Sequence, residues 1–233
     1  MSNYSKGLHT NYLLTKCFVI VLLFPLQVLG ADQSCQSFLL QGEKLVIGTP
    51  AGSLQSGSLA AIVTGLDESE QLLVDFPSSE LCVSQGTSDM TETDGARFVV
   101  NPNTEELAIE ATLSGSTEIW LRLNPGYESE LLLSRSVGEE TGLTDMEFLS
   151  DNSGVGAEDF FAEQIDYLEL GSYLVDAPFA EVPRYGVEYS HYDQAVNQGA
   201  EGFIPTQGIL GLSLIRSLTL RFSQAQGLVF LVK

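Results

Sequence analysis

The chain is poor in basic residues, and this shortage excludes whole classes of partner. Its 10 lysines and arginines stand against 31 acidic residues, so the formal net charge is −21 at pH 7. A charge of this sign and size repels nucleic acids and anionic membrane surfaces. We therefore expect no nucleic-acid partner. We interpret the scattered acidic residues as a solvated face that keeps the protein soluble.

Histidine and cysteine are too sparse for the commonest metal and nucleophilic sites. The chain has two histidines and three cysteines, and none of them has the spacing of metal ligands. A glycine-rich phosphate-binding loop is also missing, so we expect neither a metal nor a cofactor. His191 is the single histidine after residue 30, and no nucleophile motif lies near it. We interpret it as an exposed loop residue.

Long apolar runs are missing after residue 30, but one occurs before it. Lys6 and Lys16 precede the apolar segment 17–29, and Val28 and Gly30 are small residues just before Ala31. This is the pattern of a secretory signal peptide, and the run is too short for a good membrane span. We expect residues 1–30 to be removed and the mature protein to be secreted, in a bacterial periplasm. An uncleaved N-terminal anchor is the alternative.

The mature chain would contain about 203 residues, enough for one large domain or two small ones. It would hold 8 basic and 31 acidic residues, a net charge of −23. Cys17 leaves with the signal peptide, so Cys35 and Cys82 remain as an even pair in an oxidising compartment. We predict a disulfide between them, and the alternative is two buried thiols.

Residues 31–103 consist of short apolar runs separated by glycine, serine and other turn residues. No long helical period is present, so the pattern predicts a small antiparallel β domain that contains the disulfide. The runs are 38–40, 45–47, 59–63, 72–74, 81–83 and 98–100, and turns are expected at 91–95 and 101–104. The second turn is the expected domain boundary.

Residues 104–233 continue the β pattern with clearer strands. Apolar and polar residues alternate over 106–113, which is typical of a half-buried strand. Further strands are expected at 118–123 and 130–134, a short helix at 135–142, a hairpin of 160–170 with 173–182, a polar loop at 184–206, and apolar segments at 207–212, 214–222 and 228–232. The strand at 118–123 runs into a turn that reads Asn124-Pro125-Gly126.

The order of these segments resembles the retropepsin-like family of aspartic proteases, which is a single lobe of the pepsin fold. The resemblance covers about 125 residues, and the family's catalytic Asp-Thr-Gly is matched by Asn124, Pro125 and Gly126. The flap is matched by Gly154, Val155 and Gly156, and the apolar-apolar-Gly motif behind the catalytic loop by Ile209, Leu210 and Gly211. The resemblance implies an all-β chain, in which a single-lobe β-barrel domain, 104–233, follows the small β domain, 31–103.

The replacement in the turn decides the functional expectation. The family uses two carboxylates that share one proton, and a single-lobe chain obtains the second by forming a homodimer. Asn124 has no ionisable group, and Pro125 lacks both the hydroxyl and the backbone N–H of the family's threonine. We therefore expect a pseudoprotease that binds a peptide or protein in the old cleft, with a homodimer as a further option.

An active aspartic endopeptidase that uses another carboxylate is the first alternative. Segment 72–83, LLVDFPSSELCV, resembles the pepsin motif, so Asp75 would be the catalytic group. The turn glycine of that motif is replaced here by Pro77, which opposes the match. The other acidic candidates are interpreted as solvated; they are Asp145, Asp151, Glu158, Asp159 and, in a strand, Asp166. A structural envelope module, with the fold as a scaffold only, is the second alternative.

Overall fold

The computed structural model describes residues 34–48, 54–86, 91–101, 106–143, 160–183 and 206–232. All of them belong to one compact unit, Ala31–Lys233. The expected signal peptide, the turn at 101–104 and the polar loop at 184–206 lie wholly or mainly outside the described residues. Within the described residues, no helix is both long enough and apolar enough to cross a membrane.

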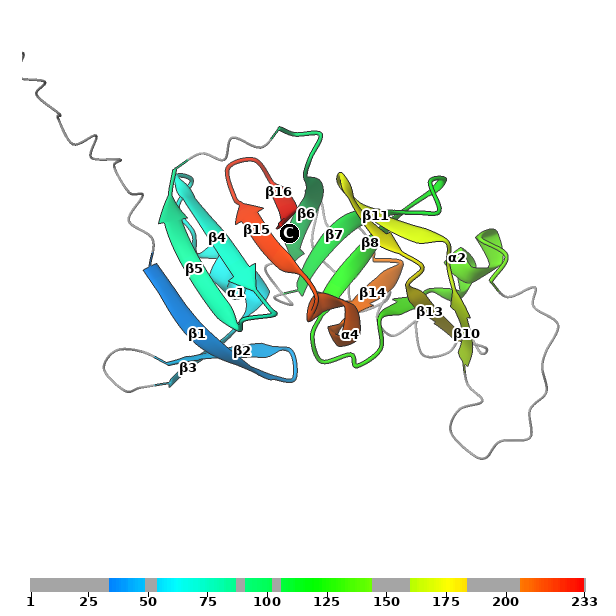
Figure 1. Ribbon diagram of the computed structural model, residues 1–233, viewed down its shortest axis with the longest axis horizontal. Coiled ribbons are helices and arrows are strands. Elements are labelled where there is room, and N and C mark those ends of the chain that lie inside the picture. Colours follow the sequence, from blue (N-terminus) through cyan, green and yellow to red (C-terminus); the bar gives the residue numbers. More distant parts are fainter. Residues whose placement is uncertain are drawn as a thin grey trace, which may run out of the picture. The chain divides into compact units, whose positions relative to one another are not determined.

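The chain is all-β, as the sequence predicts, and its described strands join one mixed sheet (Figure 1). The first half forms β1 (Ser34–Gln41), β2 (Lys44–Gly48), β3 (Leu54–Ser58), α1 (Leu59–Thr64), β4 (Glu70–Asp75), β5 (Glu80–Gln85) and β6 (Ala96–Asn101). The second half forms β7 (Glu106–Leu113), β8 (Thr117–Asn124), β9 (Leu131–Leu133), α2 (Arg135–Glu140), β10 (Phe160–Gln164), β11 (Tyr167–Leu170), β12 (Tyr173–Asp176), β13 (Phe179–Pro183), β14 (Gly208–Gly211), α4 (Leu212–Ile215), β15 (Thr219–Ser223) and β16 (Leu228–Val232).

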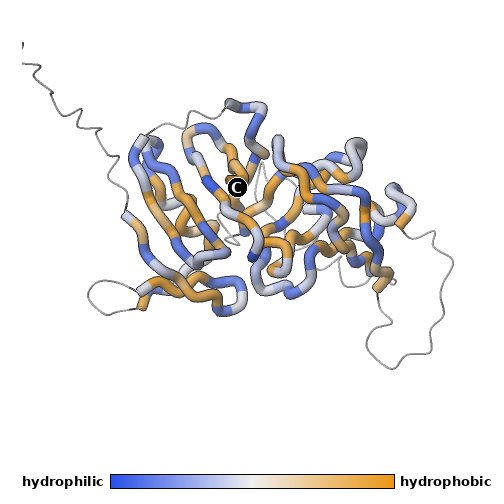
Figure 2. The backbone as a smooth tube through the Cα atoms, in the orientation of Figure 1, coloured by the Kyte–Doolittle hydropathy of each residue, from blue (hydrophilic) through white to orange (hydrophobic). Residues whose placement is uncertain are grey.

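Strand β8 lies in the middle of the second half and is buried on both faces. It pairs with β7 on one side and β14 on the other, and its last six residues are all buried. Because side chains alternate along a strand, Trp120, Arg122 and Asn124 lie on one face while Leu121 and Leu123 lie on the other. The hydrophobic positions run along this and the neighbouring strands in Figure 2. A rigid, buried strand therefore carries the turn that the sequence singled out.

Two local predictions, a helix and a hairpin, are confirmed by the structure. The helix expected at 135–142 is α2, where the Ser134 hydroxyl accepts a hydrogen bond from the Val137 N–H at 3.3 Å. Gly142 follows with a φ of +77°, a conformation that favours glycine. The hairpin expected at Gly171 is formed by β11 and β12, and Gly171 has a φ of +62°.

One apolar run in the N-terminal β pattern is a helix instead. Residues 59–63 form most of α1, in which Leu59, Ala60 and Val63 are buried. The Ser58 hydroxyl caps this helix by accepting from the Ala61 N–H at 3.1 Å. The run is short enough to fit either period, so the cap and the two alanines decide for helix.

The last strands of the chain belong to the same sheet as its first half. All of β15, Thr219 to Ser223, pairs with β4, and β16 pairs with β6. Residues beyond 218 are thus hydrogen-bonded to the segment 31–103. The division into two domains at residue 103 stays a prediction, and these pairings join the two parts through main-chain hydrogen bonds.

The predicted disulfide is confirmed. Strands β1 and β5 are antiparallel, and their register places Cys35 directly opposite Cys82. The two residues are covalently joined, with 4.0 Å between their Cα atoms. The bridge fixes β1 to β5 at the start of the described chain.

Candidate functional site

The candidate site is the loop 124–130, which connects β8 to β9. Strand β14 lies between these two strands, parallel to β8 and antiparallel to β9. The register places Gly211 opposite Asn124, so the end of β14 meets the start of the loop. The structure thus brings Ile209, Leu210 and Gly211 against the strand that carries Asn124, although the two segments lie far apart in the sequence.

Gly211 permits a very close passage of the loop over β14. A Cβ atom at this position would lie 2.1 Å from the carbonyl oxygen of Ser129 and 2.8 Å from Cδ1 of Tyr127. No side chain fits there unless the backbone moves. The glycine of the apolar-apolar-Gly motif is therefore required by packing at this point of the structure.

Main-chain hydrogen bonds fix the loop to the residues that follow β14. The Gly211 N–H donates to the Glu130 carbonyl at 2.7 Å, and the Leu212 N–H donates to the Tyr127 carbonyl at 2.6 Å. The Ser213 hydroxyl donates to the carbonyl of Glu128. Three consecutive residues thus satisfy three loop carbonyls, and the loop has a defined shape.

Asn124 uses its side chain to form the turn. Only 5% of the residue is exposed, and its Oδ1 accepts a hydrogen bond from the Gly126 N–H at 2.8 Å. Its main-chain carbonyl accepts from the Tyr127 N–H at 3.1 Å. This is the turn that asparagine favours, because its side chain replaces a backbone acceptor. Pro125 is buried, and Gly126 is exposed. An amide at position 124 keeps the geometry of the loop but does not ionise near neutral pH, so it cannot act as a general acid or base.

A buried arginine on the same face of β8 was not singled out by the sequence. Arg122 has 8% of its side chain exposed, and its guanidinium contacts two carboxylates. Nη1 lies 2.5 Å from Glu106 of β7, and Nη2 lies 2.7 Å from Glu43, in the turn between β1 and β2. A buried guanidinium is costly unless it is paired, so these contacts compensate it. No local sequence pattern predicts these ion pairs, because both partners of Arg122 belong to other elements of the chain.

A tyrosine and a glutamate form a second polar group beside the loop. The hydroxyl of Tyr127 donates to Oε2 of Glu181 in β13, and the Ser129 hydroxyl donates to Oε1 at 3.1 Å. Burial, assisted by the bond to Glu181 and by its charge, raises the pKa of Tyr127 well above the ordinary value of 10.0. Tyr127 is thus a neutral donor at physiological pH. Sequence reasoning missed Glu181 because strand register alone brings β13 to β9.

Asp75 is not brought beside Asn124 by strand pairing. It ends β4, and in the order of the sheet β7, β6, β16 and β15 lie between β8 and β4. Its carboxylate accepts from the Ser78 hydroxyl at 2.6 Å and from the Thr219 hydroxyl at 3.1 Å. The bond from Ser78 holds the pKa of Asp75 below its ordinary value of 3.8. These contacts suit a charged residue that closes the turn after β4.

The remaining predicted residues fall into two groups. Asp166 is described, and the expectation that it lies in a strand is wrong: it is exposed in a bend between β10 and β11. The chain bends here because the partner strands change, from β13 for β10 to β12 and β7 for β11. The others lie outside the described residues; they are Gly154, Val155, Gly156, Asp145, Asp151, Glu158, Asp159 and His191.

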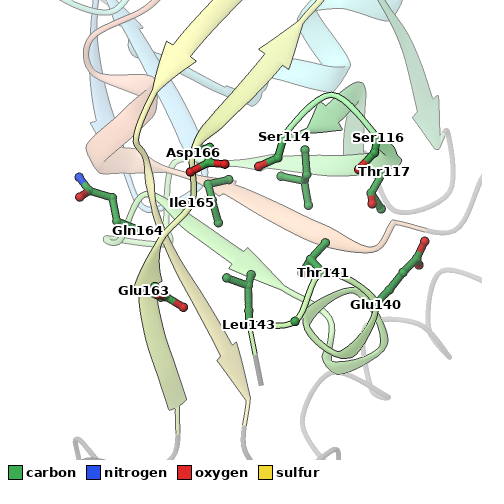
Figure 3. A pocket seen from close by; sticks show the side chains of 12 residues that line it. Ser114, Ser116, Thr117, Glu140, Thr141, Leu143, Glu163, Gln164, Ile165 and Asp166 are labelled. Atoms are coloured by element: carbon green, nitrogen blue, oxygen red, sulfur yellow. The ribbon is translucent and has the colours of Figure 1, made fainter. Parts of the chain in front are cut away.

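A cavity of about 350 Å³ lies near Thr117, the first residue of β8, and thus at the opposite end of that strand from Asn124. Its walls include Glu140, Glu163 and Asp166 around the apolar Leu143 and Ile165 (Figure 3). None of the residues predicted for the loop site lines this cavity. Among the described residues, no three histidine, cysteine, aspartate or glutamate side chains gather as metal ligands would.

Comparison with known proteins gives a distant likeness. No protein-family model matches the chain. No curated protein matches it either. One similar solved structure is a retropepsin-like aspartic protease from Rickettsia conorii, with 12% identity and a TM-score of 0.37 over 59% of this chain and 92% of the other. Another is Basic 7S globulin from soybean, with 10% identity and a TM-score of 0.35 over 82% of this chain and 66% of the other. Because both TM-scores lie below 0.5, the functional argument rests on the geometry of the loop.

Proposed function

We propose that this is a secreted protein with a retropepsin-like loop, that it does not cleave peptides, and that it binds a peptide or protein at the loop 124–130. The proposal rests on the burial and hydrogen bonding of the Asn124 side chain. Its Oδ1 is bonded to the Gly126 N–H, and the residue is buried. An acid–base mechanism needs a group that takes a proton from water at this place, and an amide does not do so.

Glu43 and Glu181, which lie beside the loop, and the alternative candidate Asp75 do not replace the missing aspartate. Glu43 is paired with Arg122, and Glu181 accepts from Tyr127 and Ser129. Asp75 lies in another part of the sheet, where Ser78 and Thr219 bind it. Each of the three carboxylates is thus engaged by at least one other side chain. These contacts argue against an acid–base catalytic role for all three.

Binding of an extended peptide needs no acid. Main-chain groups and shaped surfaces recognise an added strand, and the side chains of the ligand supply specificity. The loop is well suited to present such a surface, because Gly211, Leu212 and Ser213 fix its carbonyl groups. Gly126 and Glu128 are its exposed residues, and Gly126 lies directly after the buried Asn124 and Pro125.

A cleavage assay between pH 3 and 7 on a broad peptide library tests the absence of catalysis. The wild type is expected not to cut, and the double variant Asn124→Asp/Pro125→Thr is expected to gain cleavage that pepstatin inhibits. The single variant Pro125→Thr is the control, because it adds no carboxyl group. Pepstatin-sensitive cleavage by the wild type would contradict the proposal, and its loss in Asp75→Asn would then support the alternative endopeptidase.

The same library, retained on the immobilised wild-type protein, tests binding. Peptides that bind at the loop should be lost in Gly126→Trp, which adds bulk at an exposed loop residue. Gly48→Trp is the control for added bulk alone, since a side chain at Gly48 meets open space. A side chain at Gly126 also meets Glu43 and Asn124, so the melting temperature of Gly126→Trp is measured to show that the variant folds. Equal retention by both variants would place binding elsewhere, and no retention by the wild type would favour the scaffold alternative.

A further inference from the structure

The turn between β1 and β2, in the N-terminal part of the chain, contacts the candidate loop. Gln41 pairs with Lys44, so Gly42 and Glu43 form a two-residue hairpin turn, and Gly42 has a φ of +60°. We call Gly42 and Glu43 the hairpin tip. The tip and the loop belong to different halves of the described chain, so only the fold brings them together.

Two side chains flank the same point above Gly126. A Cβ atom built on Gly126 would lie 3.0 Å from Cγ of Glu43 and 3.1 Å from Oδ1 of Asn124. The backbone nitrogen of Glu43 lies 3.4 Å from that point. Since both distances are measured to one point, Cγ of Glu43 and Oδ1 of Asn124 lie no more than about 6 Å apart. The hairpin tip therefore abuts the turn that holds Asn124.

Arg122 fixes Glu43 in this position. Although 54% of the Glu43 side chain is exposed, its Oε1 lies 2.7 Å from Nη2 of the buried Arg122. Arg122 and Asn124 are two residues apart on β8, so both side chains lie on one face of the strand. Glu106 holds the other side of the same guanidinium. The position of Glu43 is thus set by a buried charge that belongs to the strand carrying Asn124.

We infer that Glu43 is a residue of the loop site, supplied by the hairpin tip of the same chain, so that a carboxylate faces position 124 without a second copy of the protein. The site then consists of an amide from β8 and a carboxylate from the N-terminal hairpin. The inference extends the proposed function, because it takes the loop 124–130 as the site. Its tests need neither a ligand nor catalysis, so they can fail independently of the cleavage and binding assays.

The variant Asn124→Asp tests the distance between the two groups. Two carboxyl groups this close do not both ionise easily, so one of them should titrate above its ordinary range. The charged groups that meet Glu43 are Arg122 of β8 and, through it, Glu106 of β7, while β14 carries no charged residue. Because Glu43 already contacts the guanidinium of Arg122, the raised pKa is expected at the new aspartate.

The measurement is a carboxyl-carbon NMR titration of the full chain. In Asn124→Asp we expect the new aspartate to titrate about one unit or more higher than in Asn124→Asp/Glu43→Gln. A third variant, Asn124→Asp/Glu139→Gln, is the control, because Glu139 pairs with Arg135 on the exposed face of α2. The same pKa at residue 124 in all three variants would overturn the inference.

Because a new buried carboxylate can prevent folding, a second test uses the wild-type loop. Hydrogen exchange is followed at the amides of Gly126 and Tyr127, which donate to Asn124. Glu43→Ala should speed exchange there at least threefold, while Glu139→Ala should leave it unchanged. Equal rates in both variants, or a uniform increase over the whole chain, would show that the tip does not support the loop.

Discussion

At the scale of single residues, the shape of the loop depends on the contacts of a few side chains and on one glycine. Asn124 forms the turn with its own side chain, and Arg122 joins three segments through two ion pairs. Gly211 allows the loop to cross β14 at a distance that no side chain tolerates. Asn124 thus gives the turn its shape, and its side chain carries no ionisable group.

Gly211→Ala should destabilise the protein through overpacking. The added methyl group would meet the carbonyl of Ser129, a backbone atom that hydrogen bonds in the loop hold in place. We expect a loss of about 3 kcal/mol in the free energy of unfolding, at the upper end for added volume in a packed core. Urea denaturation measures it, and Gly48→Ala, which meets open space, is the control. A similar small change in both variants would contradict the close passage.

At the scale of elements, the strand order of the sheet separates Asp75 from Asn124. Asp75 ends β4 and Asn124 ends β8, and the sequence suggested each as a candidate for a catalytic position. The strands that carry them are not neighbours in the sheet. Asp75 instead joins the end of β4 to the start of β15, because Thr219 donates to its carboxylate.

The depressed pKa of Asp75 predicts how this contact responds to acid. A carboxyl group whose pKa is lower in the folded state contributes stability above its unfolded pKa. That contribution is lost as the pH falls through the folded value, which lies below 3.8. Asp75→Asn should therefore be less stable than the wild type at pH 7, and the difference should disappear toward pH 2.

Urea denaturation at several pH values measures this difference. Asp166→Asn provides a control, since Asp166 is exposed in a bend. The same difference between wild type and Asp75→Asn at pH 7 and pH 2 would show that the charge of Asp75 has no structural role. Loss of the difference in acid would support the interpretation of Asp75 as a turn residue.

At the scale of the whole molecule, covalent and hydrogen-bonded connections link the two ends of the described chain. The disulfide ties β1 to β5, β4 pairs with β15, and β16 pairs with β6. The N-terminal hairpin is therefore anchored at one end by Cys35 and at its tip by Arg122. The first strands are part of the structure that supports the loop.

Replacing both bridged cysteines by serine should lower the free energy of unfolding by about 4 kcal/mol. Cys35 and Cys82 are separated by 47 positions in the sequence. A cross-link over this distance stabilises the folded state mainly by reducing the conformational entropy of the unfolded chain. Thermal unfolding of wild type and variant, each with and without a reducing agent, measures the effect. A reducing agent should destabilise only the wild type. An unchanged melting temperature in the variant would mean that the bridge contributes no stability.

The sequence by itself determined the features that depend on near neighbours in the chain. The alternation over 106–113 predicted β7, and the helix expected at 135–142 contains α2. The disulfide was predicted by cysteine count instead, because two cysteines remain after residue 30. Hydrophobic period and turn chemistry act over a few residues, so they can be read locally. The same rules misassigned 59–63, where a run of five apolar residues fits both periods and the cap at Ser58 decides.

Only the tertiary structure decided which distant segments meet. It placed β14 between β8 and β9, and it brought Glu43 to Arg122 and Glu181 to Tyr127. The sequence around Arg122 does not predict a partner in the N-terminal hairpin, because an ion pair between distant segments leaves no periodic pattern in the sequence. Strand register and the need to compensate a buried charge select such contacts, and both are properties of the assembled sheet.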